Sequence, residues 1–235
     1  MLFVENLSKS FYGLEVFKNI NFQVQQNEAI GLMGPNGAGK TTLVNVLTGE
    51  LKSSGGVVKL HDKEITNFPS DKIRKIGIAR TYQIPRAFSK MSVLENVLVA
   101  ARFGGKLNAK AAMDMAKESL ELVGLYERRQ QLARELQFSD LRMLELARAS
   151  VTNPQLIFID EVAAGMPDSD LPKILDALSK IRATGKTIII IEHIIKVLIK
   201  IVDRILVLNE GQIILDDTPE KVMGNEKVIE AYLGK

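Results

Sequence analysis

The stretch Gly34-Pro35-Asn36-Gly37-Ala38-Gly39-Lys40-Thr41 decides the fold of this chain, because it fits the pattern G-x-x-x-x-G-K-[ST] of a phosphate-binding loop. Its glycines permit left-handed backbone conformations, which turn peptide N–H groups towards a phosphate chain. Lys40 supplies a positive charge for the β- and γ-phosphates, and the hydroxyl of Thr41 can ligate Mg²⁺. The stretch therefore predicts that the chain binds a nucleoside triphosphate together with Mg²⁺.

The residues on either side of the loop support this interpretation. Ala29 to Met33 predict a short buried strand that enters the loop, and Thr42 to Leu47 predict the first turns of a helix whose positive N-terminus faces the anion. A chance glycine-rich turn is the alternative, and this strand and helix context disfavours it. We expect the nucleotide to be bound by Gly34, Pro35, Asn36, Gly37, Ala38, Gly39, Lys40, Thr41 and Thr42.

The composition is that of a cytosolic globular protein. The chain has 235 residues, of which 46% are hydrophobic, so it can bury a large core. The absence of cysteine excludes disulfides and thiolate metal sites. The net charge of +3 is dispersed, which argues against nucleic-acid binding. No apolar stretch approaches the ~18 residues of a membrane span. A membrane, if one is involved, must be supplied by a partner.

Hydrophobic periodicity predicts strands at the start of the chain, a helical block in the middle, and alternating strands and helices after Pro154. Ser92 and Glu95 have the spacing of a capping box at the start of a helix. The turns are expected at Phe11-Tyr12-Gly13 and Asn209-Glu210-Gly211-Gln212. The strands are expected at residues 2–7, 16–24, 29–33, 57–60, 75–80, 156–159, 187–191, 205–208 and 213–215. The helices are expected to begin near Ser92 and to cover residues 109–123, 141–149, 171–182 and 194–201.

A second element of phosphate chemistry is Leu156-Ile157-Phe158-Ile159-Asp160-Glu161. Four apolar residues predict a buried strand that delivers two carboxylates to its C-terminal edge, where ligands bind in parallel sheets. We expect Asp160 to hold Mg²⁺, directly or through water, and Glu161 to polarise the attacking water. The alternative, an acid that only caps a helix, is less favoured beside a phosphate loop.

With these motifs in this order, the chain resembles the ATP-binding subunits of ABC transporters over essentially its whole length. The resemblance implies that Tyr12 stacks on adenine, where the alternative is a core or edge-strand aromatic. It implies that Gln83, in Arg80-Thr81-Tyr82-Gln83, reaches Mg²⁺ and the attacking water. It also implies that His193 contacts the γ-phosphate. We expect His61 to be a surface residue.

The resemblance implies the fold as well. It is an α/β fold with a P-loop NTPase (RecA-like) core, an N-terminal antiparallel β-subdomain and an inserted helical subdomain. Residues 1–235 would form a single ATP-binding domain. Its β-subdomain and core would comprise residues 1–87 and 151–235, and its helical subdomain would comprise about residues 88–150.

Within this family the chain is most similar to the ATP-binding subunits of branched-chain amino acid importers. The similarity lies in residues 80–88, in Met91-Ser92-Val93-Leu94-Glu95-Asn96-Val97 and in the ending Ala231-Tyr232-Leu233-Gly234. Subunits for urea uptake and lipopolysaccharide export share the Tyr-Leu-Gly ending, so transport of urea or a lipid is the alternative.

The chain departs from the family at its signature, usually Leu-Ser-Gly-Gly-Gln, which falls on Leu136-Gln137-Phe138-Ser139-Asp140. In the family this segment opens a helix that grips the γ-phosphate bound by the opposite subunit. Gln137 replaces the serine and Ser139 the second glycine, so we expect the helix to persist and the grip to weaken. Val162 stands where the family has a proline after the catalytic glutamate, and Pro167-Asp168 reverses the family's order of a polar residue followed by proline. We expect these changes to affect communication between the two ATP sites.

The leading hypothesis is a peripheral ATPase at the cytoplasmic face of the membrane that uses ATP and Mg²⁺ to power amino acid import. Its implied partners are integral membrane permease subunits, a second ATP-binding subunit in a hetero- or homodimer and, indirectly, a substrate-binding protein, with no nucleic acid. The altered signature motivates the alternative of a nucleotide-dependent regulatory or weakly hydrolytic subunit in a heterodimer. A soluble ABC-type protein of DNA repair or ribosomes is disfavoured, because 235 residues leave no room for its usual insertions.

Overall fold

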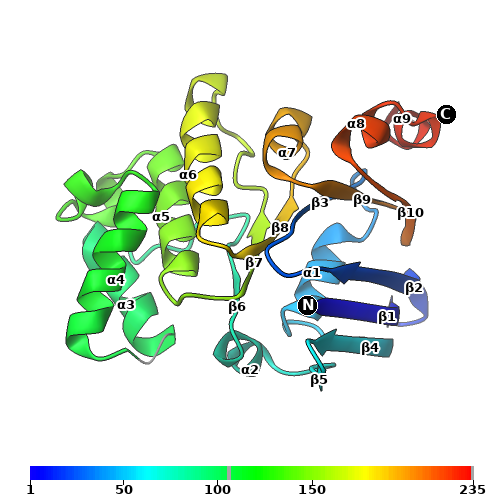
Figure 1. Cartoon of the computed structure of the whole chain (residues 1–235), viewed down its shortest axis with the longest axis horizontal. Coiled ribbons are helices and arrows are strands. Elements are labelled where there is room, and N and C mark those ends of the chain that lie inside the picture. The colour runs from blue at the N-terminus through cyan, green and yellow to red at the C-terminus, as the bar shows by residue number, and fades with distance from the viewer. Residues whose placement is uncertain (105–106, 234–235) are drawn as a thin grey trace. The chain divides into compact units, whose positions relative to one another are not determined.

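The structure is a computed structural model that describes residues 1–104 and 107–233 (Figure 1). Gly234, which closes the ending quoted above, lies outside the described residues. The chain divides into two compact units. The first unit comprises Met1–Ile73 and Ile189–Lys235, and the second comprises Arg74–Ile188.

The first unit begins with an antiparallel sheet in the order β2-β1-β4-β5. Its strands are β1 (Leu2–Phe11), β2 (Leu14–Val24), β4 (Gly55–Leu60) and β5 (Lys63–Glu64). Leu2, Val4 and Leu7 are buried while Glu5 is exposed, as the alternating sequence predicts. Tyr12 and Gly13 form the turn with φ angles of 49° and 88°. The predicted antiparallel opening and its turn are confirmed.

The first unit also contains a mixed set of strands beside the phosphate loop. β3 (Ala29–Met33) pairs in parallel with β9 (Arg204–Asn209), which pairs antiparallel with β10 (Gln212–Asp217). All five residues of β3 are buried, as is typical of a parallel strand. The helices of this unit are α1 (Lys40–Leu47), α7 (Ile195–Ile201), α8 (Pro219–Met223) and α9 (Glu226–Leu233). α8 contacts β9, β10 and α9, so α8 packs onto this unit and against α9.

The second unit combines a parallel strand pair with a group of helices. β6 (Ile78–Arg80) pairs in parallel with β7 (Leu156–Asp160). Three helices pack on one another, namely α3 (Val93–Gly104), α4 (Ala109–Leu122) and α5 (Phe138–Ser150), which Figure 1 shows in green. α6 (Leu171–Ala183) contacts α4 and α5. Short 3₁₀ helices cover Tyr126–Arg128, Ala133–Glu135 and Asp168–Asp170. The helices α3 to α5 lie inside the expected helical segment, whose domain boundaries stay a prediction.

Two elements carry the chain from one unit to the other, α2 (Ser70–Lys75) and β8 (Thr187–Ile191). The strand predicted for residues 75–80 is shorter in the structure, because Lys75 ends α2 and the strand begins only at Ile78. Gly77 lies between them with a φ of 89°, a conformation that an extended strand cannot include. The sequence patterns also missed α2, α8 and α9.

The predicted capping box at the start of α3 is confirmed. The Ser92 amide donates to Glu95 Oε2 at 2.7 Å, and the Glu95 amide donates to Ser92 Oγ at 3.2 Å. These two bonds satisfy backbone donors that the first turn of a helix leaves without intrahelical partners. None of the described helices combines the length and the apolar character that a membrane crossing requires.

Candidate functional site

The phosphate loop joins β3 to α1 within the first unit, as predicted. A Cβ atom on Gly34 would lie 2.0 Å from the carbonyl oxygen of Leu208 in β9, so only glycine fits there. Gly39 has a φ of 103° in the left-handed region and forms the N-cap of α1. Its carbonyl oxygen accepts the first helical bond, from Leu43 N at 2.8 Å. The loop therefore ends at a helix N-terminus, where anions are favoured.

Lys40 is held over the loop rather than extended into solvent. Its side chain is 7% exposed. Its Nζ donates to the carbonyl oxygens of Gly34 at 2.7 Å and Pro35 at 3.0 Å. A phosphate oxygen makes a stronger, charge-assisted bond with an ammonium group than a carbonyl does. Lys40 can thus exchange loop carbonyls for the phosphates of a bound nucleotide. Thr41 and Thr42 follow in the first turn of α1.

The other site residues predicted in the first unit are Tyr12 and His193. The Tyr12 side chain is fully exposed at the turn between β1 and β2, so it is not a core aromatic. His193 is half-buried two residues after β8. Its amide donates at 3.3 Å to the carboxylate of Glu192, which is 1% exposed. Contact of either residue with a nucleotide stays a prediction. His61 is exposed, as expected.

In the second unit, Asp160 ends β7 with its carboxylate fixed by neighbours. It is 4% exposed, and Arg80 Nη2 in β6 donates to its Oδ2 at 2.9 Å. The Asp160 amide donates to Thr81 Oγ1 at 3.0 Å, so the chain after β6 also holds the backbone. Burial raises the pKa of Asp160, and the Arg80 guanidinium partly offsets this rise. The sequence patterns did not predict the pairing with Arg80.

Glu161 lies directly after Asp160, next to Gln83. Gln83 Nε2 donates to Glu161 Oε2 at 2.6 Å, so the structure brings these two predicted catalytic residues together. The φ of Glu161 is 45°, in the left-handed region. Such a conformation costs on the order of 1–3 kcal/mol in a residue other than glycine, and it persists where the surroundings impose it.

The donors predicted for Mg²⁺ fit that ion. Among the residues that the structure describes, the second oxygen of Asp160, Oδ1, makes no hydrogen bond, and it can accept from a metal-bound water. Gln83 uses its amide nitrogen on Glu161, which leaves its amide oxygen for a cation. Within the same described ranges, no group of three or more His, Cys, Asp or Glu could hold a metal. Mg²⁺ is commonly bound by one or two carboxylates together with substrate phosphates, which suits this donor set.

The altered signature begins α5, so the expected helix is present. Gln137 occupies the N-cap position, but its side chain makes no capping bond. Ser139 and Asp140 are each 8% exposed. The Asp140 carboxylate forms an ion pair with Arg128, which reduces the negative charge that Asp140 would present to an anion.

Sequence analysis did not single out four residues that connect these elements. Arg80 and Arg128 are the partners of Asp160 and Asp140. Arg142 in α5 donates to the carbonyl oxygens of Tyr82 at 3.2 Å and Ala164 at 3.4 Å, between the segments that carry Gln83 and Glu161. Tyr232 accepts a hydrogen bond from Gly34 N at 2.7 Å. For Arg80 a signal existed, because it lies at the C-terminal end of the strand expected at residues 75–80.

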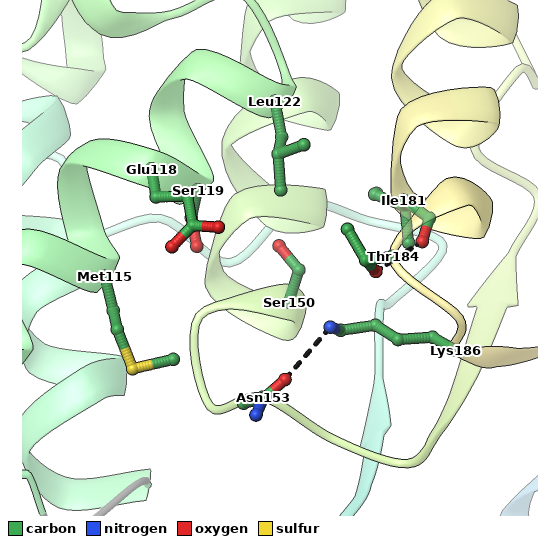
Figure 2. A pocket seen from close by; sticks show the side chains of 9 residues that line it. All are labelled: Met115, Glu118, Ser119, Leu122, Ser150, Asn153, Ile181, Thr184 and Lys186. Atoms are coloured by element: carbon green, nitrogen blue, oxygen red, sulfur yellow. Dashed lines mark hydrogen bonds between the residues drawn. The ribbon is translucent and has the colours of Figure 1, made fainter.

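A separate cavity of about 230 Å³ lies in the second unit among α4, α5 and α6 (Figure 2). Lys186 Nζ points into it and donates to Asn153 Oδ1 at 3.0 Å. Ser150 Oγ donates to the carbonyl oxygen of Leu146 at 2.9 Å. Burial lowers the pKa of Lys186, and the carboxylate of Glu118 partly offsets this change. None of the predicted site residues lines this cavity, so we assign it no part in nucleotide binding.

Comparisons with known proteins support the resemblance. Residues 17–164 match the family described as ABC transporter, and residues 212–235 match the family described as branched-chain amino acid ATP-binding cassette transporter. The chain is 37% identical to the high-affinity branched-chain amino acid transport ATP-binding protein LivG of Salmonella typhimurium, with 100% of this chain and 98% of the relative covered. A probable LivG of Archaeoglobus fulgidus is 33% identical, with 100% and 95% covered.

Solved structures agree with the fold. The ADP conformation of an ATP-binding cassette of an ABC transporter has a TM-score of 0.89 and 30% identity, covering 100% of this chain and 99% of that one. A nucleotide-free cassette has a TM-score of 0.87 and 29% identity, with the same coverage. The α/β fold with a P-loop NTPase core, predicted above, is confirmed.

Proposed function

The chain belongs to the ABC transporter family as one of its ATP-binding proteins, and we propose that it hydrolyses ATP to power the import of branched-chain amino acids. One observation carries this proposal: the similarity to LivG proteins extends over the whole chain. The separate match of residues 212–235 to the branched-chain family supports the choice of cargo over urea or a lipid.

The proposed hydrolysis gives each predicted site residue a role. The phosphate loop with Lys40 and Thr41 binds the triphosphate, and Tyr12 stacks on adenine. Glu161 acts as the base that polarises the attacking water, and Gln83 orients its carboxylate through the 2.6 Å hydrogen bond.

Asp160, with Thr41 and Gln83, would hold Mg²⁺, which when bound neutralises charge on the phosphates. His193 donates a hydrogen bond to the γ-phosphate in this proposal, where it stabilises the charge that develops during transfer. Arg80 keeps the carboxylate of Asp160 in place for this role.

We further propose that the chain works as a peripheral subunit at the cytoplasmic face of the membrane. Family membership implies membrane permease subunits and dimerisation of the ATP-binding subunits. ATP-driven closure of two such subunits moves the permease, and the substrate-binding protein takes part only indirectly. The dispersed net charge of +3 supports no role for nucleic acid.

A second candidate function is a weakly hydrolytic or regulatory subunit paired with a different ATP-binding subunit. The observation that favours it is the signature, in which Gln137 and Ser139 replace a hydroxyl and a glycine that the family uses on the opposite nucleotide. Such a heterodimer would have one strong and one weak site. Glu161 and His193 argue against a chain that only binds nucleotide.

The test is ATP hydrolysis by the purified chain, alone and with its partner subunit, alongside Glu161→Gln and the matched control Glu121→Gln in α4. Loss of phosphate release in Glu161→Gln only, with ATP binding retained, supports the ATPase. Equal activity in the unmodified chain and both variants would refute it. Low turnover that rises with the partner subunit supports the heterodimer, and full activity in isolation contradicts it.

Cargo is tested by uptake of labelled leucine, isoleucine and valine in cells that carry the complete transporter. Lys40→Ala should abolish uptake, because the triphosphate loses its positive contact. Uptake of urea in place of the amino acids would overturn the cargo assignment while leaving the ATPase intact.

A further inference from the structure

Helix α9 contacts the phosphate loop through Tyr232. Tyr232, in the last turn of α9, accepts a hydrogen bond through its hydroxyl oxygen from the amide of Gly34 at 2.7 Å. The two residues are 198 positions apart and lie in the same unit. Tyr232 lies in the segment 212–235 that matches the branched-chain family and outside the segment 17–164 that matches ABC transporters in general.

Gly34 is held on both sides of its backbone. Its N–H is bonded to Tyr232, and its carbonyl oxygen accepts from Lys40 Nζ at 2.7 Å. The closeness of the Leu208 carbonyl oxygen also limits where the residue can move. The tyrosine hydroxyl, the Gly34 backbone and the Lys40 ammonium thus form one connected series of contacts. A shift of Gly34 would displace the carbonyl on which Lys40 rests.

The hydroxyl of Tyr232 suits this position. α9 packs through Val228, which is 5% exposed, so the helix can hold the ring in place. Burial raises the pKa of Tyr232, and the bond from Gly34 only partly offsets the rise. The hydroxyl therefore stays neutral at physiological pH and adds no negative charge beside a loop that binds anions.

We infer that Tyr232 is a positioning residue of the nucleotide site, whose hydroxyl fixes the Gly34 amide and thereby the phosphate loop and Lys40. This inference rests on the proposed ATP binding. It gives the C-terminal helix a role in nucleotide affinity. The hydroxyl acts through Gly34, so it affects how tightly the loop binds and leaves the hydrolytic step at Glu161 unchanged.

The test compares the full chain with Tyr232→Phe, which keeps the ring and its packing and removes only the hydroxyl. The matched control is Tyr126→Phe, whose hydroxyl lies in the second unit. Two quantities are measured: the Kd for a fluorescent ATP analogue and hydrogen exchange of the Gly34 amide without nucleotide. Tyr232→Phe should weaken binding roughly five-fold, which corresponds to about 1 kcal/mol, the net value of one hydrogen bond. It should also speed exchange at Gly34 and raise KM with kcat unchanged.

An unchanged Kd and unchanged Gly34 exchange in Tyr232→Phe, in a chain that binds ATP, would overturn the inference. A fall in kcat with KM unchanged would also contradict it. If the unmodified chain binds no ATP, the proposed function fails instead, and the exchange of the Gly34 amide still tests the contact with Tyr232. The two failures are therefore distinguishable.

Discussion

Gln83 and Glu161 are joined by a 2.6 Å hydrogen bond from Nε2 to Oε2, in a chain where they are 78 residues apart. Glu161 has a left-handed φ of 45° and Gln83 follows β6, so each comes from the end of a paired strand. The bond fixes the orientation of the carboxylate that we assign as the catalytic base. Binding of ATP by the phosphate loop and orientation of the catalytic base therefore depend on different residues.

We predict that Gln83→Ala lowers kcat for ATP hydrolysis roughly ten- to a hundred-fold, because the Glu161 carboxylate loses the donor that orients it. The Kd for ATP measured without Mg²⁺ should stay within about two-fold of the original, since Gln83 is not part of the phosphate loop. Steady-state phosphate release and equilibrium binding measure the two quantities. Gln25→Ala, at an exposed position between β2 and β3, is the control and should change neither. A loss of ATP binding in Gln83→Ala would assign the residue to the nucleotide instead.

Much of the fold could be predicted from local patterns. The apolar runs of β3, β7 and β8 are buried along their whole length, so each strand was recognised from a few residues. The capping box needed only Ser92 and Glu95. The short helices α2 and α8 have five or six residues, too few for a helical period to stand out. Gly77, whose positive φ delays the start of the predicted strand to Ile78, gave no sign of its conformation in the sequence.

The sequence predicts those parts of the candidate site that lie in short continuous motifs. Phosphate-loop residues follow from one stretch of sequence, and Asp160 and Glu161 from another. The contacts that hold them depend on distant residues: Arg80 is 80 positions from Asp160, and Tyr232 is 198 positions from Gly34. Hydrophobic periodicity shows which face of an element is buried, but it does not show which polar side chain lies opposite. These partners therefore required the structure.

The ion pair between Arg128 and Asp140 makes a prediction about the stability of α5. The Asp140 side chain is 11% exposed, so Arg128→Ala would leave a nearly buried carboxylate without its cation. Because the Arg128 side chain is 51% exposed and solvent screens the pair, we expect the free energy of unfolding to fall by about 1 kcal/mol. Urea denaturation measures the change. Arg134→Ala, at an exposed position nearby, should have little effect. In an Asp140→Asn background, Arg128→Ala should lower the free energy of unfolding much less than it does in the unmodified chain. Equal decreases in the two backgrounds would rule out the pairing.

The capping box of α3 makes the stability of the chain depend on pH. The bond from the Ser92 amide lowers the pKa of Glu95 below its ordinary value of 4.5. Because the folded-state pKa is the lower one, the stabilisation is fully present above the unfolded pKa. It is lost as the pH falls through the folded pKa. We expect Glu95→Gln to reduce the loss of stability between pH 7 and pH 3, because glutamine keeps the capping bond without titrating. Urea titrations across this range test it, and an unchanged pH profile would contradict it.

The capping box of α3 also predicts a loss of stability at neutral pH when Ser92 is replaced. Ser92→Ala should lower the free energy of unfolding by about 1 kcal/mol, the usual effect of losing an N-cap side chain. Ser89→Ala, at an exposed position between β6 and α3, is its control. Equal effects of the two substitutions would show that the Ser92 hydroxyl does not cap α3.

The N-cap of α5 links stability to the altered signature. Gln137 has extended φ and ψ angles of −70° and 162°, as an N-cap residue should, yet its side chain makes no capping bond. Serine is among the preferred residues at this position, so Gln137→Ser should raise the free energy of unfolding by about 1 kcal/mol. The substitution also restores the hydroxyl of the family signature. If the weak signature limits the isolated chain, its ATP turnover should rise as well. Gln25→Ser is the control for both measurements. Greater stability without faster turnover would mean that Ser139 and Asp140, rather than the missing hydroxyl, limit the site.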